Sequence, residues 1–172
     1  YINKDILIRR NDMDIREALL ELVNLESVRY SYMAIEKIII VMMRDYLKAQ
    51  NKRLLAENEV MHRISDMILP DGIDNEDGCI AAEIKLYRHK QMSLRLIYDT
   101  IGRFSINRGE INKLLLIVVN ELPEGIRNRI EEKKKQLNFE LTIWDIDDLI
   151  RIFSNNENLF VETYNNLNTV LL

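Results

Sequence analysis

The sequence predicts an α/β protein, a three-layer sandwich in which helices flank a central mixed β-sheet. Short apolar runs alternate with longer stretches of helical periodicity along the chain. The unbroken apolar run at 114–119 is typical of a strand that is covered on both faces. The chain has only five Gly and two Pro, which favours long regular elements.

The composition is that of an ordinary globular protein, because 47% of the 172 residues are hydrophobic and 30% are charged. This length predicts one main domain. We expect an N-terminal helical extension over 1–25, the domain over 26–153, and a linker or docking segment over 154–172. No apolar run is long enough to span a bilayer, so no membrane partner is expected. The single cysteine, Cys79, excludes an internal disulfide and fits a reducing compartment such as the cytoplasm.

The first half of the chain is predicted to be two helices and a hairpin. Asp14, with Glu17 three residues later, predicts a helix start, and a second helix with an apolar centre is expected over about 26–50. Residues 51–67 have a helical pattern overall, although 61–69 could begin a strand. The extended segment 69–74, the turn signal at 75–78 and the strand pattern at 79–85 together predict a β-hairpin.

The second half is predicted to alternate helices with buried strands. We expect a helix over about 90–104, a strand over 113–120 and a helix over 123–137 that begins at Pro123. Residues 140–144 predict the last strand, and Asp145 is expected to cap a helix that ends near Phe153. This order implies helices on both faces of a mixed sheet.

Acidic residues around the hairpin suggest a metal site. Glu83 and Lys85 are two apart on a strand and therefore point to the same face. With the turn centred on 75–78, Asp71 is expected opposite Ala82 or Glu83, where two carboxylates can share one Mg²⁺. Asp74 is the alternative, at roughly 10 Å from Glu83 by the same pairing, and the shorter separation favours Asp71.

Pro70-Asp71 followed by Glu83-Ile84-Lys85 resembles the motif of the PD-(D/E)XK, or restriction-endonuclease-like, nuclease superfamily. The segment 71–74 and the segment 141–149 are similar to the Mrr-like branch, and the resemblance covers about 26–153. It implies the restriction-endonuclease-like fold, with Mg²⁺ as the cofactor and Mn²⁺ as a substitute. Asp71, Glu83 and Lys85 would then be the catalytic residues, although in the Mrr-like pattern the acid can be the later one, here Asp74.

The same resemblance implies two further contributions to the metal site. The backbone carbonyl of Ile84 would be a metal ligand. Glu36, on the first core helix, would lie near the metal as a further catalytic residue. The alternative is that Glu36 sits at the helix edge and pairs with Lys37 or Arg29, since a buried carboxylate needs a partner.

Charge is distributed unevenly along the chain, although the net charge is −4. Basic residues dominate 85–113, whereas acidic residues dominate after 138. A basic segment beside the predicted site suits the phosphates of DNA, and we expect Arg88, Lys90 and Arg95 to contact them. His89 is more consistent with a surface residue. The lysines at 133–135 follow two glutamates, so a solvated helix face with ion pairs is favoured there.

The expected function is that of a Mg²⁺-dependent endonuclease acting on DNA, as an effector of restriction or anti-phage defence. RNA cleavage stays open because a fold does not fix the substrate. The alternative is a catalytically silent nuclease-like domain for nucleic-acid docking or assembly. The non-Met residue Tyr1 suggests a part of a larger chain or complex with an activating module, and a homodimer stays open.

Overall fold

The computed structural model describes residues 14–56, 65–88 and 93–170. Its centre is a five-stranded mixed sheet in the order β1-β2-β3-β4-β5. The first three strands pair antiparallel: β1 (Leu55–Ala56), β2 (Met67–Leu69) and β3 (Ile80–Leu86). The last two continue the sheet parallel to β3: β4 (Lys113–Val119) and β5 (Glu140–Trp144). The predicted α/β class with a mixed sheet is therefore confirmed.

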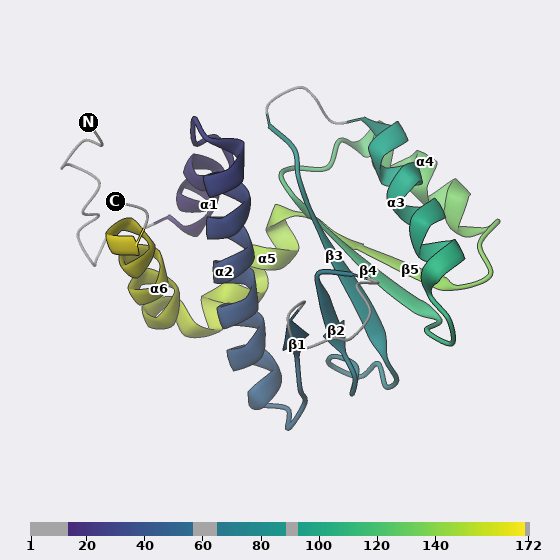
Figure 1. Ribbon diagram of the computed structural model, residues 1–172, viewed down its shortest axis with the longest axis horizontal. Helices are drawn as coiled ribbons and strands as arrows, with labels where there is room; N and C mark the ends of the chain where they lie inside the picture. The colour runs from purple at the N-terminus through teal and green to yellow at the C-terminus, as the bar shows by residue number, and fades with distance from the viewer. Residues whose placement is uncertain (1–13, 57–64, 89–92, 171–172) are drawn as a thin grey trace.

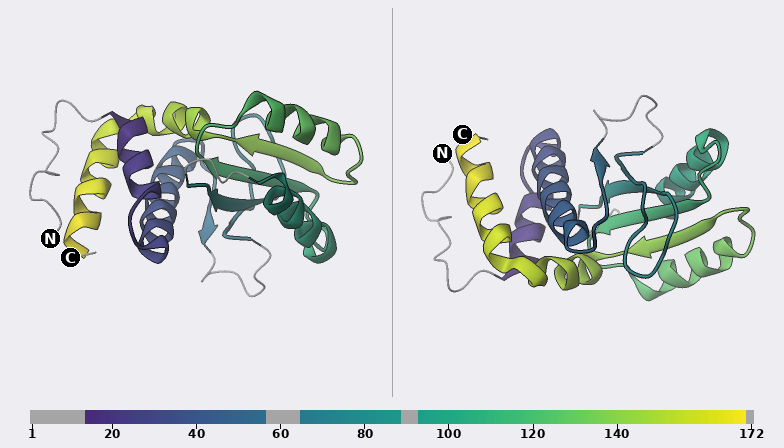
Figure 2. Two further views of the ribbon diagram at one scale, coloured as in Figure 1. Left: turned by 90° about the horizontal axis from the view of Figure 1, so that it is seen from above. Right: turned by 90° about the horizontal axis from the view of Figure 1, so that it is seen from below.

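Helices pack against both faces of the sheet (Figure 1). One core is shared by α1 (Ile15–Val23), α2 (Val28–Lys48), α5 (Ile146–Phe153) and α6 (Glu157–Val170), with a short 3-10 turn at Ser154–Asn156 before α6. The other core lies under α3 (Leu94–Asn107) and α4 (Glu124–Lys134). Figure 2 shows the two groups of helices from above and below. No helix in the described ranges is long and apolar enough to cross a membrane.

Local signals in the sequence account for the helix starts. Asp14 accepts the backbone N–H of Arg16, and Ser27 accepts that of Tyr30 at the start of α2. Asp145 forms a capping box with Asp148 at the start of α5. The helix predicted over 26–50 and the strands predicted over 113–120 and 140–144 are confirmed, with ends that move by at most two residues.

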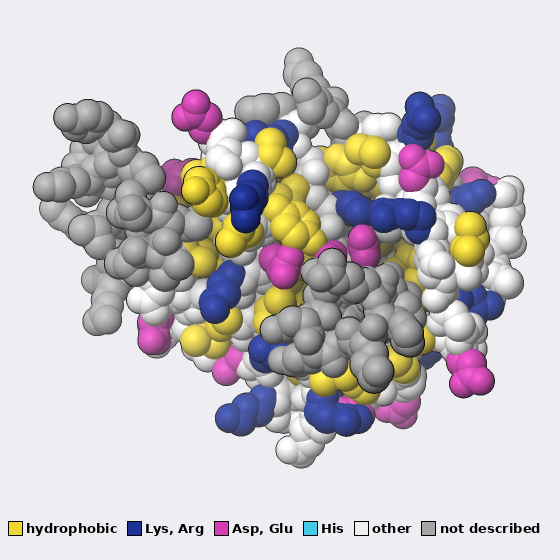
Figure 3. All heavy atoms as spheres, in the orientation of Figure 1, with side chains coloured by type: hydrophobic (Ala, Val, Ile, Leu, Met, Phe, Trp, Pro, Cys, Tyr) yellow, Lys and Arg dark blue, Asp and Glu magenta, His cyan; other side chains and the backbone are white. Residues whose placement is uncertain are grey.

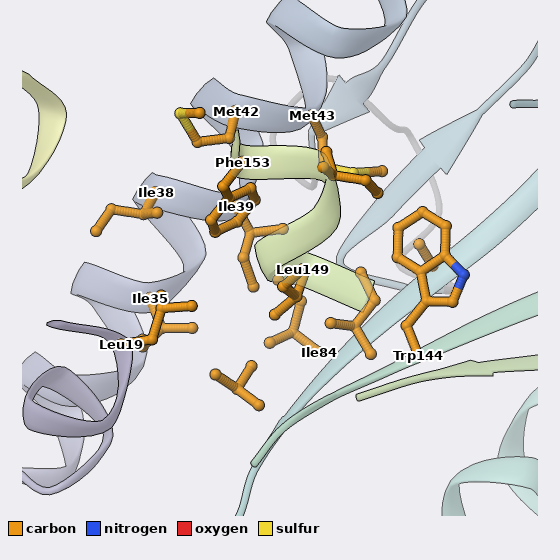
Figure 4. Close-up of a cluster of buried hydrophobic side chains, with 14 of the residues drawn as sticks. Leu19, Ile35, Ile38, Ile39, Met42, Met43, Ile84, Trp144, Leu149 and Phe153 are labelled. Carbon is orange, nitrogen blue, oxygen red and sulfur yellow. The ribbon is translucent and has the colours of Figure 1, made fainter. Parts of the chain in front are cut away.

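The larger core is formed where α2 meets α5 and the sheet. Figure 4 shows Ile39 and Met43 of α2 close to Phe153 of α5, with Ile84 and Trp144 of the sheet beside them. Full burial of one such side chain contributes roughly 1.5–3 kcal/mol relative to exposure.

The helix α6 extends this core. Phe160 and Tyr164 are buried there, and the Tyr164 hydroxyl donates to Glu21 of α1 at 3.1 Å. The described residues of the expected N-terminal extension and C-terminal segment thus share one core with the central domain.

The hairpin differs from the predicted one in its loop. Strand β2 ends at Leu69, next to Pro70, which has no N–H to donate to a ladder. Leu69 pairs with Ile80 and Met67 with Ala82, and Ile73 and Glu76 exchange two backbone hydrogen bonds, so the tight turn lies at 74–75 and not at the predicted 75–78. A Cβ at Gly72, where φ is +79°, would lie 2.0 Å from the Glu76 carbonyl oxygen, so this fold of the loop requires glycine.

This register contradicts one prediction about the site. Asp71 does not lie opposite Ala82 or Glu83, because it belongs to the loop beyond the last pair of β2 and β3. Asp66 precedes the Met67–Ala82 pair, and its carboxylate accepts the backbone N–H of Ile84, which places Asp66 beside Glu83.

Candidate functional site

Asp66 joins α2 to β3 through its carboxylate. Its Oδ2 accepts the backbone N–H of Ile84 at 2.6 Å, and its Oδ1 accepts the Tyr32 hydroxyl at 2.6 Å. Because β2 begins only at Met67, the carboxylate satisfies a backbone donor that a longer strand would otherwise pair. The two hydrogen bonds fix the position of Asp66 next to Glu83.

Tyr32 stands among three carboxylates. Burial raises the pKa of its hydroxyl far above the usual value, and the hydrogen bond to Asp66 and the charges of Asp66, Glu36 and Glu83 raise it further. The hydroxyl is therefore a permanent donor to Asp66. Glu36 follows Tyr32 by one helical turn and is half-buried, so α2 places it close enough for its charge to act on the Tyr32 hydroxyl.

Glu83 and Lys85 share one face of β3, on the side of α3. Their side chains are 17% and 25% exposed, and Lys85 Nζ donates to Glu83 Oε1 at 3.2 Å. Burial raises the pKa of Glu83 and the charge of Asp66 adds to this, against the opposing effects of Lys85 and Arg103. Burial is the largest of these effects, so Glu83 is a partly desolvated carboxylate next to a second acid.

The donor set at this place fits a hard divalent cation. Mg²⁺ is held by one or two carboxylates and keeps several waters, and Asp66 and Glu83 are the residues that would hold it. Each oxygen of Asp66 accepts one hydrogen bond and has a further lone pair for a cation. Among residues 14–56, 65–88 and 93–170, no three His, Cys, Asp or Glu side chains gather closely enough to hold a metal, so water would complete the coordination.

The predicted ligand Asp71 is engaged elsewhere. Its Oδ2 accepts the backbone N–H and the Nε of Arg53 at 3.0 and 2.9 Å, and its Oδ1 accepts Nη2 of the same residue at 2.9 Å. These hydrogen bonds lower the pKa of Asp71 to about 2. Asp71 therefore anchors the hairpin loop to the segment after α2.

The alternative ligand Asp74 also fastens this loop. Its Oδ1 accepts the Tyr46 hydroxyl at 2.6 Å and the Gln50 amide at 3.1 Å, and its own N–H donates to Gln50 at 2.8 Å. Tyr46 lies fourteen residues after Tyr32 on α2, which is roughly 21 Å along a helix. Because Tyr32 holds Asp66 and Tyr46 holds Asp74, the two acids lie near opposite ends of α2.

Of the three predicted phosphate contacts, the structure describes Arg88 and Arg95, and these two point to different partners within the protein. The Arg88 guanidinium donates to the Leu25 carbonyl, so it joins the segment after β3 to the loop between α1 and α2. Arg95 is 88% exposed, and its nearest acid is Asp99 at 4.0 Å. Lys90 and the neighbouring His89 lie outside the described residues.

A groove beside Lys85 is lined in part by basic side chains that we did not predict from the sequence as phosphate contacts. It has a volume of about 720 Å³ between the end of β3 and α3, and Lys85, Tyr87, Leu96 and Arg103 are among its lining residues. Figure 3 shows this face of the molecule, with Asp and Glu side chains near its centre and Lys and Arg beside them. The electrostatic effect of Arg103 on Glu83 places this arginine at the edge of the acidic site.

Of the site residues that the sequence did not predict, Asp66 had a weak signal. Asp66 directly precedes an apolar run, and Pro70 marks where that run ends as a strand. If the end of the first hairpin strand is set by Pro70 and not by the Asp-Gly turn, the acid nearest to Glu83 becomes Asp66 and not Asp71. Tyr32 had no comparable signal, because a tyrosine on an apolar helix is most simply a core residue.

The raised pKa of Glu83 predicts a stabilising substitution. The folded protein holds the Glu83 proton more tightly than the unfolded chain, so stability falls as the pH rises from the ordinary value of 4.5 through the raised pKa. In EDTA, Glu83→Gln should therefore melt at a higher temperature than wild type at pH 7, and the difference should shrink as the pH falls below 4.5. Thermal melts across this pH range measure it, and an equal difference at every pH would contradict the electrostatic cause.

No family model matches the chain, and no curated protein is significantly similar to it. Its function is therefore inferred from the residues and their arrangement.

Proposed function

We propose that the chain is a divalent-metal-dependent endonuclease with a restriction-endonuclease-like fold, hydrolysing phosphodiester bonds in DNA. Its catalytic centre is Asp66, Glu83 and Lys85. The observation that carries the proposal is the hydrogen bond from the Ile84 N–H to Asp66 at 2.6 Å, which holds this acid beside Glu83, two residues before Lys85 on the same face of β3. An effector role in restriction or anti-phage defence belongs to the same proposal and rests on the resemblance to the Mrr-like branch.

The arrangement of elements supports this assignment. A long core helix precedes an antiparallel hairpin that carries the acids, and two strands with intervening helices extend the sheet in parallel. That is the order expected for the superfamily from the sequence. The acid beside the first hairpin strand is Asp66, directly before β2, in place of Asp71.

Each residue has a separate role in the proposed reaction. Asp66 and Glu83 would hold the cation, and Tyr32 orients Asp66 through its hydroxyl. Lys85 places a positive charge where negative charge develops on the phosphoryl group. When bound, a divalent cation neutralises charge on the phosphate and makes water a stronger nucleophile.

The second candidate function is a catalytically silent nucleic-acid-docking or assembly domain. The observation in its favour is that Asp66 already accepts two hydrogen bonds and Glu83 has an ion-pair partner within the protein. A purely structural role for these residues would produce the same contacts. The two functions differ in their response to metal.

The test is incubation of purified protein with plasmid DNA, single-stranded DNA and RNA, in Mg²⁺, Mn²⁺ or EDTA. The endonuclease should cut DNA with either metal and leave it intact in EDTA. Metal should also raise the melting temperature, since a ligand at 100 times its Kd stabilises by about 2.7 kcal/mol. A protein that neither cuts nor gains stability with metal would be the silent domain, and preferential cutting of RNA would replace DNA as the substrate.

A further inference from the structure

The groove beside the acidic site combines features that suit a nucleotide. Lys85 and Arg103 bring two positive charges to it against the one negative charge of Asp99, and Lys85 belongs to both the groove and the proposed catalytic centre. Leu96, half-exposed on α3, and Tyr98 give it apolar and aromatic surface. Its volume of about 720 Å³ is within the range of small-molecule sites.

Tyr87 in the wall of this groove has an unsatisfied hydroxyl. The residue is 3% exposed, and within the described part of the chain its hydroxyl has no hydrogen-bond partner. Most buried polar groups are hydrogen-bonded, and leaving one unsatisfied is costly. The hydroxyl is therefore a buried donor to which the described chain offers no acceptor, on a residue that lines the groove.

We propose that this groove binds one unstacked nucleotide of a single-stranded segment in the nucleic-acid substrate. The inference rests on the proposed function, because it places this nucleotide next to the phosphate at Asp66 and Glu83. Arg103 contacts a backbone phosphate, the base lies against Leu96 and Tyr98, and the Tyr87 hydroxyl donates to an oxygen or nitrogen of the nucleotide. A base that is paired and stacked in a duplex cannot enter a groove of this kind without leaving the stack.

The protein should therefore bind single-stranded nucleic acid at this groove in preference to a duplex. Single-strand sites combine cations that follow the backbone with aromatic or apolar surfaces for bases, and both are present here. A duplex can use the cations but not the surfaces. The substrate class is therefore a strand with at least one unpaired nucleotide beside the cut.

The test measures binding of a fluorescein-labelled ten-residue oligothymidylate by anisotropy, in EDTA so that no cleavage occurs. Arg103→Ala should weaken binding about tenfold, through the lost phosphate contact. Tyr87→Phe should weaken it about fivefold and yet leave the melting temperature equal or higher, because it removes an unsatisfied buried hydroxyl. Lys135→Ala removes one positive charge from an exposed pair with Glu132 on α4, and it is the matched control, with binding within twofold of wild type.

Unlabelled duplex of the same length should compete at least tenfold less well than the unlabelled single strand. Equal competition, together with unchanged binding by Tyr87→Phe and Arg103→Ala, would overturn the inference. If wild type cuts DNA with metal and these variants bind normally, only the groove assignment fails. If the groove variants lose binding as predicted but wild type never cuts, the proposed function fails and the groove remains a nucleotide site.

Discussion

Asp66→Asn is expected to reduce DNA cleavage 10²-fold or more, whereas Asp71→Asn leaves the rate within about twofold of wild type. Asp66 lies beside Glu83 and would share the cation with it. Asn removes the negative charge, and a hard divalent cation prefers carboxylate oxygens. The carboxylate of Asp71, in the hairpin loop, accepts hydrogen bonds from Arg53. Its loss should therefore affect the anchoring of the loop and not the reaction.

The measurement is a cleavage time course in Mn²⁺ for both variants, beside thermal melts with and without metal. Asp66→Asn can also lower stability, because its amide NH₂ would face one of the two donors, Tyr32 or Ile84. Glu83→Gln is therefore the second variant, since it should lose cleavage while gaining stability in EDTA. Loss of cutting by Asp71→Asn with full activity in Asp66→Asn would return the site to the acid that the motif first indicated.

Lys85→Ala is expected to reduce the cleavage rate 10²-fold or more and to leave the protein folded. The ammonium group acts on charge that develops during the reaction, where a preorganised cation has its largest effect. The substitution should also lower the stability of the fold, unlike that of a fully exposed lysine, because Lys85 is partly buried and pairs with Glu83 at 3.2 Å. We expect a loss of stability of about 1 kcal/mol from the broken pair.

Lys85→Gln separates the two effects of this residue. Gln can still donate a hydrogen bond to Glu83 but carries no charge, so it should recover most of the stability and little of the rate. Rate constants from single-turnover cleavage and unfolding free energies from urea titration give the two quantities. If Lys85→Gln cuts at the wild-type rate, the charge of Lys85 has no part in the reaction.

The sequence by itself determined most of the regular structure. The apolar run at 114–119, the strand at 140–144 and the caps at Asp14 and Asp145 are local signals, and the structure matches them. A cap needs only a side chain and the next turn of backbone, and a buried strand needs only a short apolar run. The alternation along β3 likewise placed Glu83 and Lys85 on one face.

The tertiary structure alone decided which acid joins Glu83. Pairing of β2 with β3 depends on where residues 70–79 turn, and a shift in register moves every side chain along the partner strand. Ile73 and Glu76 close the turn at 74–75, whereas the Asp-Gly signal placed it at 75–78 and the register that this implied selected Asp71. Tyr32 and Arg103 join the site from two helices far apart in sequence, and only the packing of α2 and α3 around the sheet brings them to the same end of β3.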